Sequence, residues 1–257
     1  RAAGKNLRGG ACHTSILLPL KFALYAKSCY NIFMICFVIA MESEAAPVLK
    51  NMTDKKESLI FNKKVYRGNI CGDEAAVVVC GVGKVNAACG TQTALWLGAQ
   101  AIVNIGVAGG LNSRVKVGNI YAVSHATQYD FDLSQLNGTP VGTLNEFKER
   151  WLELALAGEY PEKKLATGDR FNDDRRDYIL LTDGFGADIR DMEGGAIAQA
   201  CINAGVPCFI FKAISDVAGS GSTTEQFTHN LEMCSDKLER NICGIYTSVK
   251  QELAAKN

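Results

Sequence analysis

The chain reads Asp191-Met192-Glu193-Gly194-Gly195-Ala196 where an extended segment enters a helix. A later strand ends in Ala213-Ile214-Ser215-Asp216, and Ala40-Met41-Glu42-Ser43-Glu44-Ala45 follows an apolar run far upstream. Open α/β sheets gather their ligand groups at such strand ends. The acids of these three segments therefore predict one shared site.

The chain after residue 34 alternates between apolar strands and segments with helical periodicity. Strands that are apolar throughout are typical of a sheet buried on both faces, so we expect an α/β fold with a mostly parallel or mixed sheet covered by helices. Strands are predicted over residues 34–40, 75–80, 101–107, 119–127, 164–167, 187–191 and 207–214, and a hairpin over 58–61 and 64–71. Helices are predicted over residues 41–49, 85–97, 144–157, 175–182, 193–204 and 224–254, and a polar loop over 128–145.

The composition suits one domain and a small ligand. With 257 residues and 47% hydrophobic content, the chain can bury a large core and still form a single domain. Its 27 Lys and Arg residues balance 27 Asp and Glu residues. This balance does not suggest binding to nucleic acid or to an acidic membrane surface, and a small neutral or zwitterionic ligand fits better.

Ten cysteines are scattered along the chain, mostly within apolar runs, with no CxxC pair and no spacing typical of a metal cluster. Two interpretations stay open: buried free thiols in a reducing compartment, which we favour, or a disulfide framework. We expect neither a metal nor a cofactor.

Residues 1–33 carry five basic residues and no acid, and the chain does not begin with methionine. This composition would suit an organellar transit peptide, but an extension foreign to the domain or a translated upstream segment is the preferred interpretation. The apolar run 16–40 is interrupted by Lys21, Lys27 and Asn31, which makes it a poor membrane span. We therefore expect a leader, a folded domain over residues 34–257, and a cytoplasmic location, or an organellar one if the leader is a transit peptide.

Two glycine-rich turns follow predicted strands, Gly81-Val82-Gly83-Lys84 and Gly106-Val107-Ala108-Gly109-Gly110. Glycine lets the backbone approach a ligand without a Cβ in the way. Neither turn matches a Walker A loop or the pattern GxGxxG, so phosphate binding has weak support. The alternative is that these glycines only form tight turns after strands.

Among the three acids, Asp216 is the strongest candidate for chemistry. A carboxylate that emerges from a buried strand must be hydrogen-bonded or is costly to desolvate, and its pKa is often shifted into a range useful for proton transfer. Glu44 and Glu193 also allow a plainer interpretation, because the helix dipole favours acids at the start of a helix.

Six segments in order along the chain carry a family resemblance: 34–45 (MICFVIAMESEA), 81–87 (GVGKVNA), 104–110 (NIGVAGG), 166–169 (ATGD), 191–193 (DME) and 213–218 (AISDVA). Together they resemble the 5′-methylthioadenosine/S-adenosylhomocysteine nucleosidases of the nucleoside phosphorylase superfamily. The resemblance extends from about residue 34 to residue 249. It implies that residues 34–257 form a nucleosidase domain, a single three-layer α/β/α unit with a twisted mixed central β-sheet, and that the protein is a homodimer.

The resemblance also implies roles for the catalytic residues. Glu44 matches the general base that activates a water for attack on the anomeric carbon of ribose. Asp216 matches the acid that protonates purine N7, and Ser215 helps to orient its carboxyl group. Hydrolysis of an N-glycosidic bond passes through a sugar with oxocarbenium character, so an acid at the base and a carboxylate near the water suit this reaction.

Further positions match the substrate contacts of the family. Met192 and Glu193 match the ribose contacts, with Glu193 holding the sugar hydroxyls. Phe171 matches the aromatic residue that stacks on adenine, and the backbone of Asn172 falls where the family hydrogen-bonds the edge of the base. These positions imply a nucleoside as the bound small molecule.

The chain departs from the family pattern at two places. Ala108 and Gly109 match the turn under the nucleoside, but the preceding Val107 stands where the family usually carries Ser or Thr. Leu136 occupies roughly the place of an aromatic residue that covers the 5′-substituent, often across the dimer interface. The preferred 5′-substituent therefore stays open.

The implied reaction is hydrolysis of the N-glycosidic bond of 5′-methylthioadenosine, S-adenosylhomocysteine or 5′-deoxyadenosine, in nucleoside salvage and methionine recycling. One alternative is a purine nucleoside phosphorylase, which is disfavoured because Asn104 and Val107 offer a phosphate little and Glu44 would repel it. Another is a non-catalytic binding or storage protein on the same fold. It is disfavoured because Glu44, Glu193 and Asp216 are all present.

Overall fold

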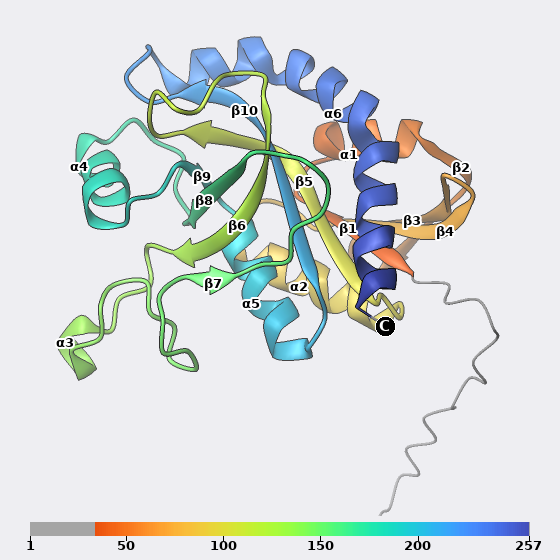
Figure 1. Cartoon of the computed structure of the whole chain (residues 1–257), viewed down its shortest axis with the longest axis horizontal. Helices are drawn as coiled ribbons and strands as arrows, with labels where there is room; N and C mark the ends of the chain where they lie inside the picture. The colour runs from red at the N-terminus through yellow and green to blue at the C-terminus, as the bar shows by residue number, and fades with distance from the viewer. Residues whose placement is uncertain (1–33, 257) are drawn as a thin grey trace, which may run out of the picture. The chain divides into compact units, whose positions relative to one another are not determined.

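A mixed ten-stranded sheet forms the centre of the computed structural model, which describes residues 34–256 (Figure 1). The expected leader, residues 1–33, lies outside the described residues, so the division of the chain at residue 34 stays a prediction. The strands are β1 (Ile35–Ile39), β2 (Met52–Ile60), β3 (Lys63–Ile70), β4 (Asp73–Val79), β5 (Ala101–Gly110), β6 (Ile120–Gln128), β7 (Leu152–Glu153), β8 (Glu162–Thr167), β9 (Ile189–Asp191) and β10 (Cys208–Val217).

The strand order is β10-β6-β8-β9-β5-β1-β4-β3-β2, with β7 beside β6. β10 also pairs with β5, so β10, β6, β8, β9 and β5 close into a ring. The neighbours β4, β1, β5 and β10 run parallel to one another. Their carboxyl ends therefore meet at one edge of the sheet, where ligand groups gather in α/β folds.

Helices cover both faces of the sheet. Packed against one face are α1 (Glu42–Lys50) and α6 (Thr223–Ala255), and against the other α2 (Lys84–Trp96) and α5 (Gly194–Ala204) (Figure 1). In β1, Cys36 and Val38 belong to the core under α2 and α5, whereas Ile35, Phe37 and Ile39 belong to the core under α1 and α6. Alternate side chains of a strand point to opposite faces, so an uninterrupted apolar run fills two cores. The predicted three-layer α/β/α fold is confirmed.

The predicted helix over residues 144–157 is wrong. This segment contains β7, which pairs with β6 through Leu152 and Glu153. Leu152 and Leu154 are buried while Glu153 between them is exposed, which is the two-residue period of a strand. Trp151 packs edge-to-face against Phe185 rather than along a helix. Short apolar spacings of this kind suit a strand as well as a helix until the neighbouring strand is known.

Other segments match the predictions with shifted bounds. β5 and β10 are longer than expected, so Asp216 lies within its strand instead of after it. The predicted helix over 175–182 is α4 (Arg175–Ile179) continued by a π-helix over Leu180–Gly184, and the polar loop contains the single-turn helix α3 (Ser134–Asn137). The predicted hairpin is formed by β2 and β3, with β2 beginning at Met52.

The eight cysteines among the described residues are free, and five of them are buried: Cys36, Cys80, Cys201, Cys208 and Cys234.

None of the helices in residues 34–256 has the length and apolar character needed to cross a membrane.

Candidate active site

One cavity of about 520 Å³ brings the three acids together. Glu44 reaches it from the first turn of α1, Glu193 from the start of α5 and Asp216 from the end of β10. Five of the six predicted contact positions also line it: Ala108, Gly109, Phe171, Met192 and Ser215. Asn172 is not among the residues that line this cavity, but its backbone carbonyl is hydrogen-bonded to Arg190, which does line it.

Glu44 is held against β5. Its Oε1 accepts a hydrogen bond from the Val107 amide at 2.8 Å, and the side chain lies so close to Gly106 that a Cβ there would be 2.5 Å from Oε1. Burial raises the pKa of Glu44, although the Lys212 ammonium partly opposes this shift. A buried carboxylate with a raised pKa can take up a proton, which is the property of a general base.

Glu193 occupies the N-cap position of α5, and its Oε1 accepts a hydrogen bond from the Gly83 amide at 2.8 Å. Gly83 has φ +94°, a backbone conformation that residues other than glycine rarely adopt. The glycine-rich turn can therefore present this amide to Glu193. Burial, reinforced by the negative charge of Asp191, raises the pKa of Glu193 to about 7.

A β-bulge directs Asp216 into the cavity. In the pairing of β10 with β5, Ile214 faces Ala108 and Asp216 faces Gly109, so Ser215 is the extra residue. Bulges next to active sites re-aim side chains in this way. The Ser215 hydroxyl donates to Asp216 Oδ1 at 2.7 Å, whereas Oδ2 is buried without a hydrogen-bond partner among residues 34–256. Burial raises the pKa of Asp216, against the opposing effects of Ser215 and the Arg190 guanidinium.

Lys212 and Asp191 form a buried salt bridge under the acids, with Lys212 Nζ 2.9 Å from Asp191 Oδ2. Burial alone would lower the pKa of Lys212, but Asp191, Glu193 and Glu44 together raise it. Asp191 also accepts hydrogen bonds from the Gly194 amide and the Thr167 hydroxyl. Sequence reasoning missed this lysine, although a single lysine within the apolar strand 208–214 signals a buried counterion.

Two phenylalanine side chains form part of the cavity wall. Phe171 meets Phe227 edge-to-face, with ring centroids 5.7 Å apart. The backbone carbonyl of the next residue, Asn172, accepts a hydrogen bond from Arg190 Nη2 at 2.7 Å. Phe227 and Arg190 were not predicted as site residues. The sequence predicts only a helix over 224–254 and a strand over 187–191 for them, and neither pattern indicates a ligand contact.

The two departures from the family pattern fall in different places. Val107 lines the cavity and presents no hydroxyl group to it. Leu136 is 80% exposed on α3 and is not among the residues that line the cavity. Among the described residues, no group of three or more His, Cys, Asp or Glu side chains is placed to hold a metal ion.

Comparison with known proteins gives the family. Residues 34–246 match the model of the phosphorylase superfamily, and the chain belongs to it. An aminodeoxyfutalosine nucleosidase from Campylobacter jejuni is 32% identical over 193 residues, which cover 70% of this chain and 84% of that protein. A 5′-methylthioadenosine/S-adenosylhomocysteine nucleosidase from Halalkalibacterium halodurans is 32% identical over 195 residues, which again cover 70% of this chain and 84% of that protein.

The fold comparison agrees. The nucleosidase structure from Colwellia psychrerythraea in complex with adenine has a TM-score of 0.75 and 27% identity, and covers 84% of this chain and 96% of that one. Within the superfamily, the chain resembles the 5′-methylthioadenosine/S-adenosylhomocysteine nucleosidases over most of its length. It is a hydrolase that acts on the N-glycosidic bond of a nucleoside.

Proposed function

We propose that the protein hydrolyses 5′-methylthioadenosine and S-adenosylhomocysteine, releasing adenine and the 5′-substituted ribose. The observation that carries this proposal is the meeting of Glu44, Glu193 and Asp216 in one cavity next to an aromatic wall. The Halalkalibacterium relative is named for both substrates, and the Colwellia structure holds adenine. Both facts support a purine nucleoside in this cavity.

Each of the three acids has its own role in the hydrolysis. Protonated Asp216 gives its proton to purine N7 as the bond between C1′ and N9 breaks, so the base leaves as a neutral molecule. A water forms the new bond to C1′ and gives its proton to Glu44. Ionised Glu193 accepts hydrogen bonds from the ribose hydroxyls. Asp216 suits the acid role because its Oδ2 has no protein partner among residues 34–256 and burial favours its protonated form.

The direct test is incubation of the purified chain with 5′-methylthioadenosine in phosphate-free buffer, with adenine measured by liquid chromatography. We expect catalytic release of adenine. A reaction that needs phosphate would identify a phosphorylase, and adenine or nucleoside binding without turnover would identify a binding protein. Either result would overturn the proposal.

The chain offers a matched pair of variants for the general base. Glu44→Gln should lower kcat by about 10²-fold or more, because glutamine cannot take up the proton of the water. Glu42→Gln is the control, since Glu42 lies on the same helix but is exposed and pairs with Lys64. Equal activity of the two variants would mean that Glu44 is only an acid at a helix start.

We also propose that the protein is a homodimer, as the family resemblance implies. Light scattering coupled to size-exclusion chromatography should give twice the mass of one chain. A monomeric mass with full activity would contradict this.

A further inference from the structure

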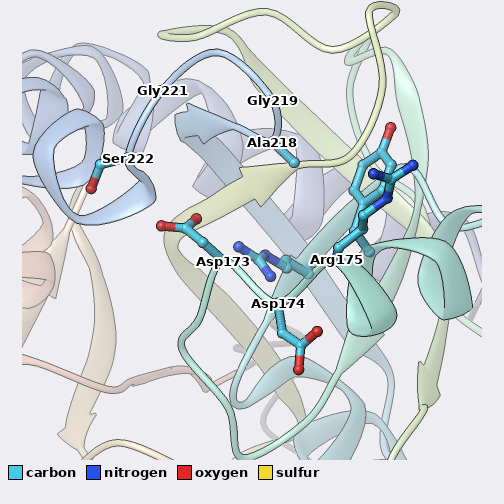
Figure 2. A pocket seen from close by; sticks show the side chains of 9 residues that line it. Asp173, Asp174, Arg175, Ala218, Gly219, Gly221 and Ser222 are labelled. Atoms are coloured by element: carbon cyan, nitrogen blue, oxygen red, sulfur yellow. The ribbon is translucent and has the colours of Figure 1, made fainter.

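Arg190 stands between the cavity of the three acids and a second one. Among residues 34–256 it is the one residue that lines both cavities, and the outer cavity measures about 480 Å³. The outer cavity lies between the loop of Asp173 and Asp174 and the loop of Ala218 to Ser222 (Figure 2). A cationic side chain therefore forms part of the wall of the nucleoside cavity at its base-binding end.

The guanidinium lies close to the group that protonates the base. A Cβ placed on Gly109 would be 2.9 Å from Asp216 Oδ2 and 3.3 Å from Arg190 Nε, so both atoms flank one small volume above Gly109. The backbone explains this placement, because β9 pairs antiparallel with β5 and sets Arg190 opposite Gly109. Asp216 faces the same glycine from β10.

The donors of Arg190 are only partly used by the protein. Nη2 donates to the Asn172 carbonyl at 2.7 Å and lies 3.4 Å from the Thr223 hydroxyl. Arg190 forms no salt bridge with any carboxylate among residues 34–256. A guanidinium carries five N–H donors and no acceptor, so this wall offers hydrogen bonds to a ligand and can accept none.

We propose that Arg190 is a specificity-determining residue that extends the base subsite from adenine to 6-oxopurines. On a purine, N7 and the substituent at C6 lie side by side on one edge. A base that presents N7 to Asp216 therefore brings its C6 substituent toward the neighbouring guanidinium. A carbonyl at C6 accepts a hydrogen bond from Arg190, whereas the amino group of adenine is itself a donor and cannot accept one from this cation.

This arrangement also helps a 6-oxopurine to leave. When the bond between C1′ and N9 breaks, the electron pair moves into the base and negative charge develops on O6. A fixed cation that faces this oxygen stabilises the developing charge, and Asp216 then supplies the proton to N7. The products are neutral hypoxanthine and the same 5′-substituted ribose that adenine release gives.

The inference rests on the proposed nucleosidase function, and two matched substrates test it. 5′-Methylthioadenosine and 5′-methylthioinosine differ only at C6, so the ratio of their kcat/KM values isolates the base contact. We expect the wild-type protein to cleave both with kcat/KM values within about tenfold of each other. Arg190→Met should lower the value for the inosine substrate by about tenfold or more relative to the adenosine substrate, the loss expected for one charge-assisted hydrogen bond.

Two further variants distinguish recognition of the base by Arg190 from its support of the loop at Asn172. Arg190→Lys keeps a cationic donor and should retain part of the activity toward the inosine substrate, while Arg175→Met, on the exposed rim of the outer cavity, should leave the ratio unchanged. Arg190→Met also loses the contact with Asn172. If Arg190 only supported this loop, kcat/KM would fall equally for both substrates and their ratio would stay at its wild-type value, so a change in the ratio reports on the base contact.

Three outcomes overturn the inference. Adenine release without hypoxanthine release contradicts the base assignment alone, and so does an equal loss on both substrates in Arg190→Met. Release of neither base contradicts the nucleosidase proposal and the base assignment with it. Calorimetric titration of the free bases adds a readout without catalysis: the wild-type protein should bind hypoxanthine, and Arg190→Met should lose hypoxanthine affinity while keeping that for adenine.

Discussion

Asp216 shows how one residue is prepared for proton transfer. Ser215 fixes one carboxyl oxygen, the other has no partner among the described residues, and burial raises the pKa. We expect Asp216→Asn to lower kcat by about 10²- to 10⁴-fold with little change in substrate binding, because asparagine keeps the shape but has no acidic proton. Single-turnover rates and equilibrium binding of 5′-methylthioadenosine measure the two effects. Near wild-type turnover in this variant would remove Asp216 from the mechanism.

Glu193 links the site to the pH dependence of stability. Its pKa is raised from 4.5 to about 7 on folding, so the folded state binds this proton more tightly than the unfolded state. The group therefore costs no stability below pH 4.5, and its cost grows as the pH rises and is complete above about 7. Glu193→Gln should remove this cost, so its unfolding free energy relative to wild type should increase between pH 5 and pH 8, by up to about 3 kcal/mol.

Urea unfolding at pH 5 and pH 8 measures this difference. The glutamine can still accept the hydrogen bond from the Gly83 amide, which keeps the local structure comparable. A pH-independent difference between the two proteins would show that Glu193 ionises normally in the folded state.

At the scale of single elements, the contact between β5 and α1 sets the position of the general base. Gly106→Ala would place a Cβ 2.5 Å from Glu44 Oε1, so the carboxylate must move away from the Val107 amide. We expect a fall in kcat of about 10²-fold, as for the loss of correct placement of a catalytic group. Gly244→Ala on α6 is the control, because no atom of the described part of the chain lies within 4 Å of its Cβ position. Full activity of Gly106→Ala would show that Glu44 tolerates a different position.

The sequence correctly predicted those strands and helices whose own hydrophobic pattern is sufficient to identify them. The run over residues 34–40 is apolar throughout because both of its faces are buried, and the resulting prediction of a strand holds for β1. The bulge at Ser215 was not predictable, because it depends on the register between β10 and β5 and not on local preference. The true ends of these strands were missed for the same reason.

At the scale of the whole molecule, the salt bridge of Lys212 and Asp191 ties β10 to the end of β9. Its side chains are 3% and 2% exposed, so removing Lys212 leaves Asp191 buried without its counterion. We expect Lys212→Met to destabilise the protein by about 3–5 kcal/mol. The double variant Lys212→Met with Asp191→Asn should recover a large part of this loss, as measured by urea unfolding. Additive losses in the double variant would contradict the pairing.

Sequence reasoning found the three acids but missed Lys212 and Arg190 as parts of the site. Glu44 and Glu193 lie at helix starts and Asp216 lies near the end of an apolar strand, so each can be recognised within its own segment. Lys212 and Arg190 gain their roles only from the ring of strands, which sets Arg190 opposite Gly109 and brings Lys212 to Asp191. Contacts between distant strands cannot be read from the order of residues alone.

The closure of β10 onto β5 leaves only β2 and the two-residue β7 with an unpaired side among the described strands. Along β2, every residue from Thr53 to Leu59 is exposed, and the charged residues Lys55, Lys56 and Glu57 stand in its middle. Its pairing with β3 is also irregular between Thr53 and Lys56. Charged side chains and irregular pairing at an edge strand disfavour pairing with a strand of another chain, so we expect this edge to disfavour growth of the sheet into fibrils.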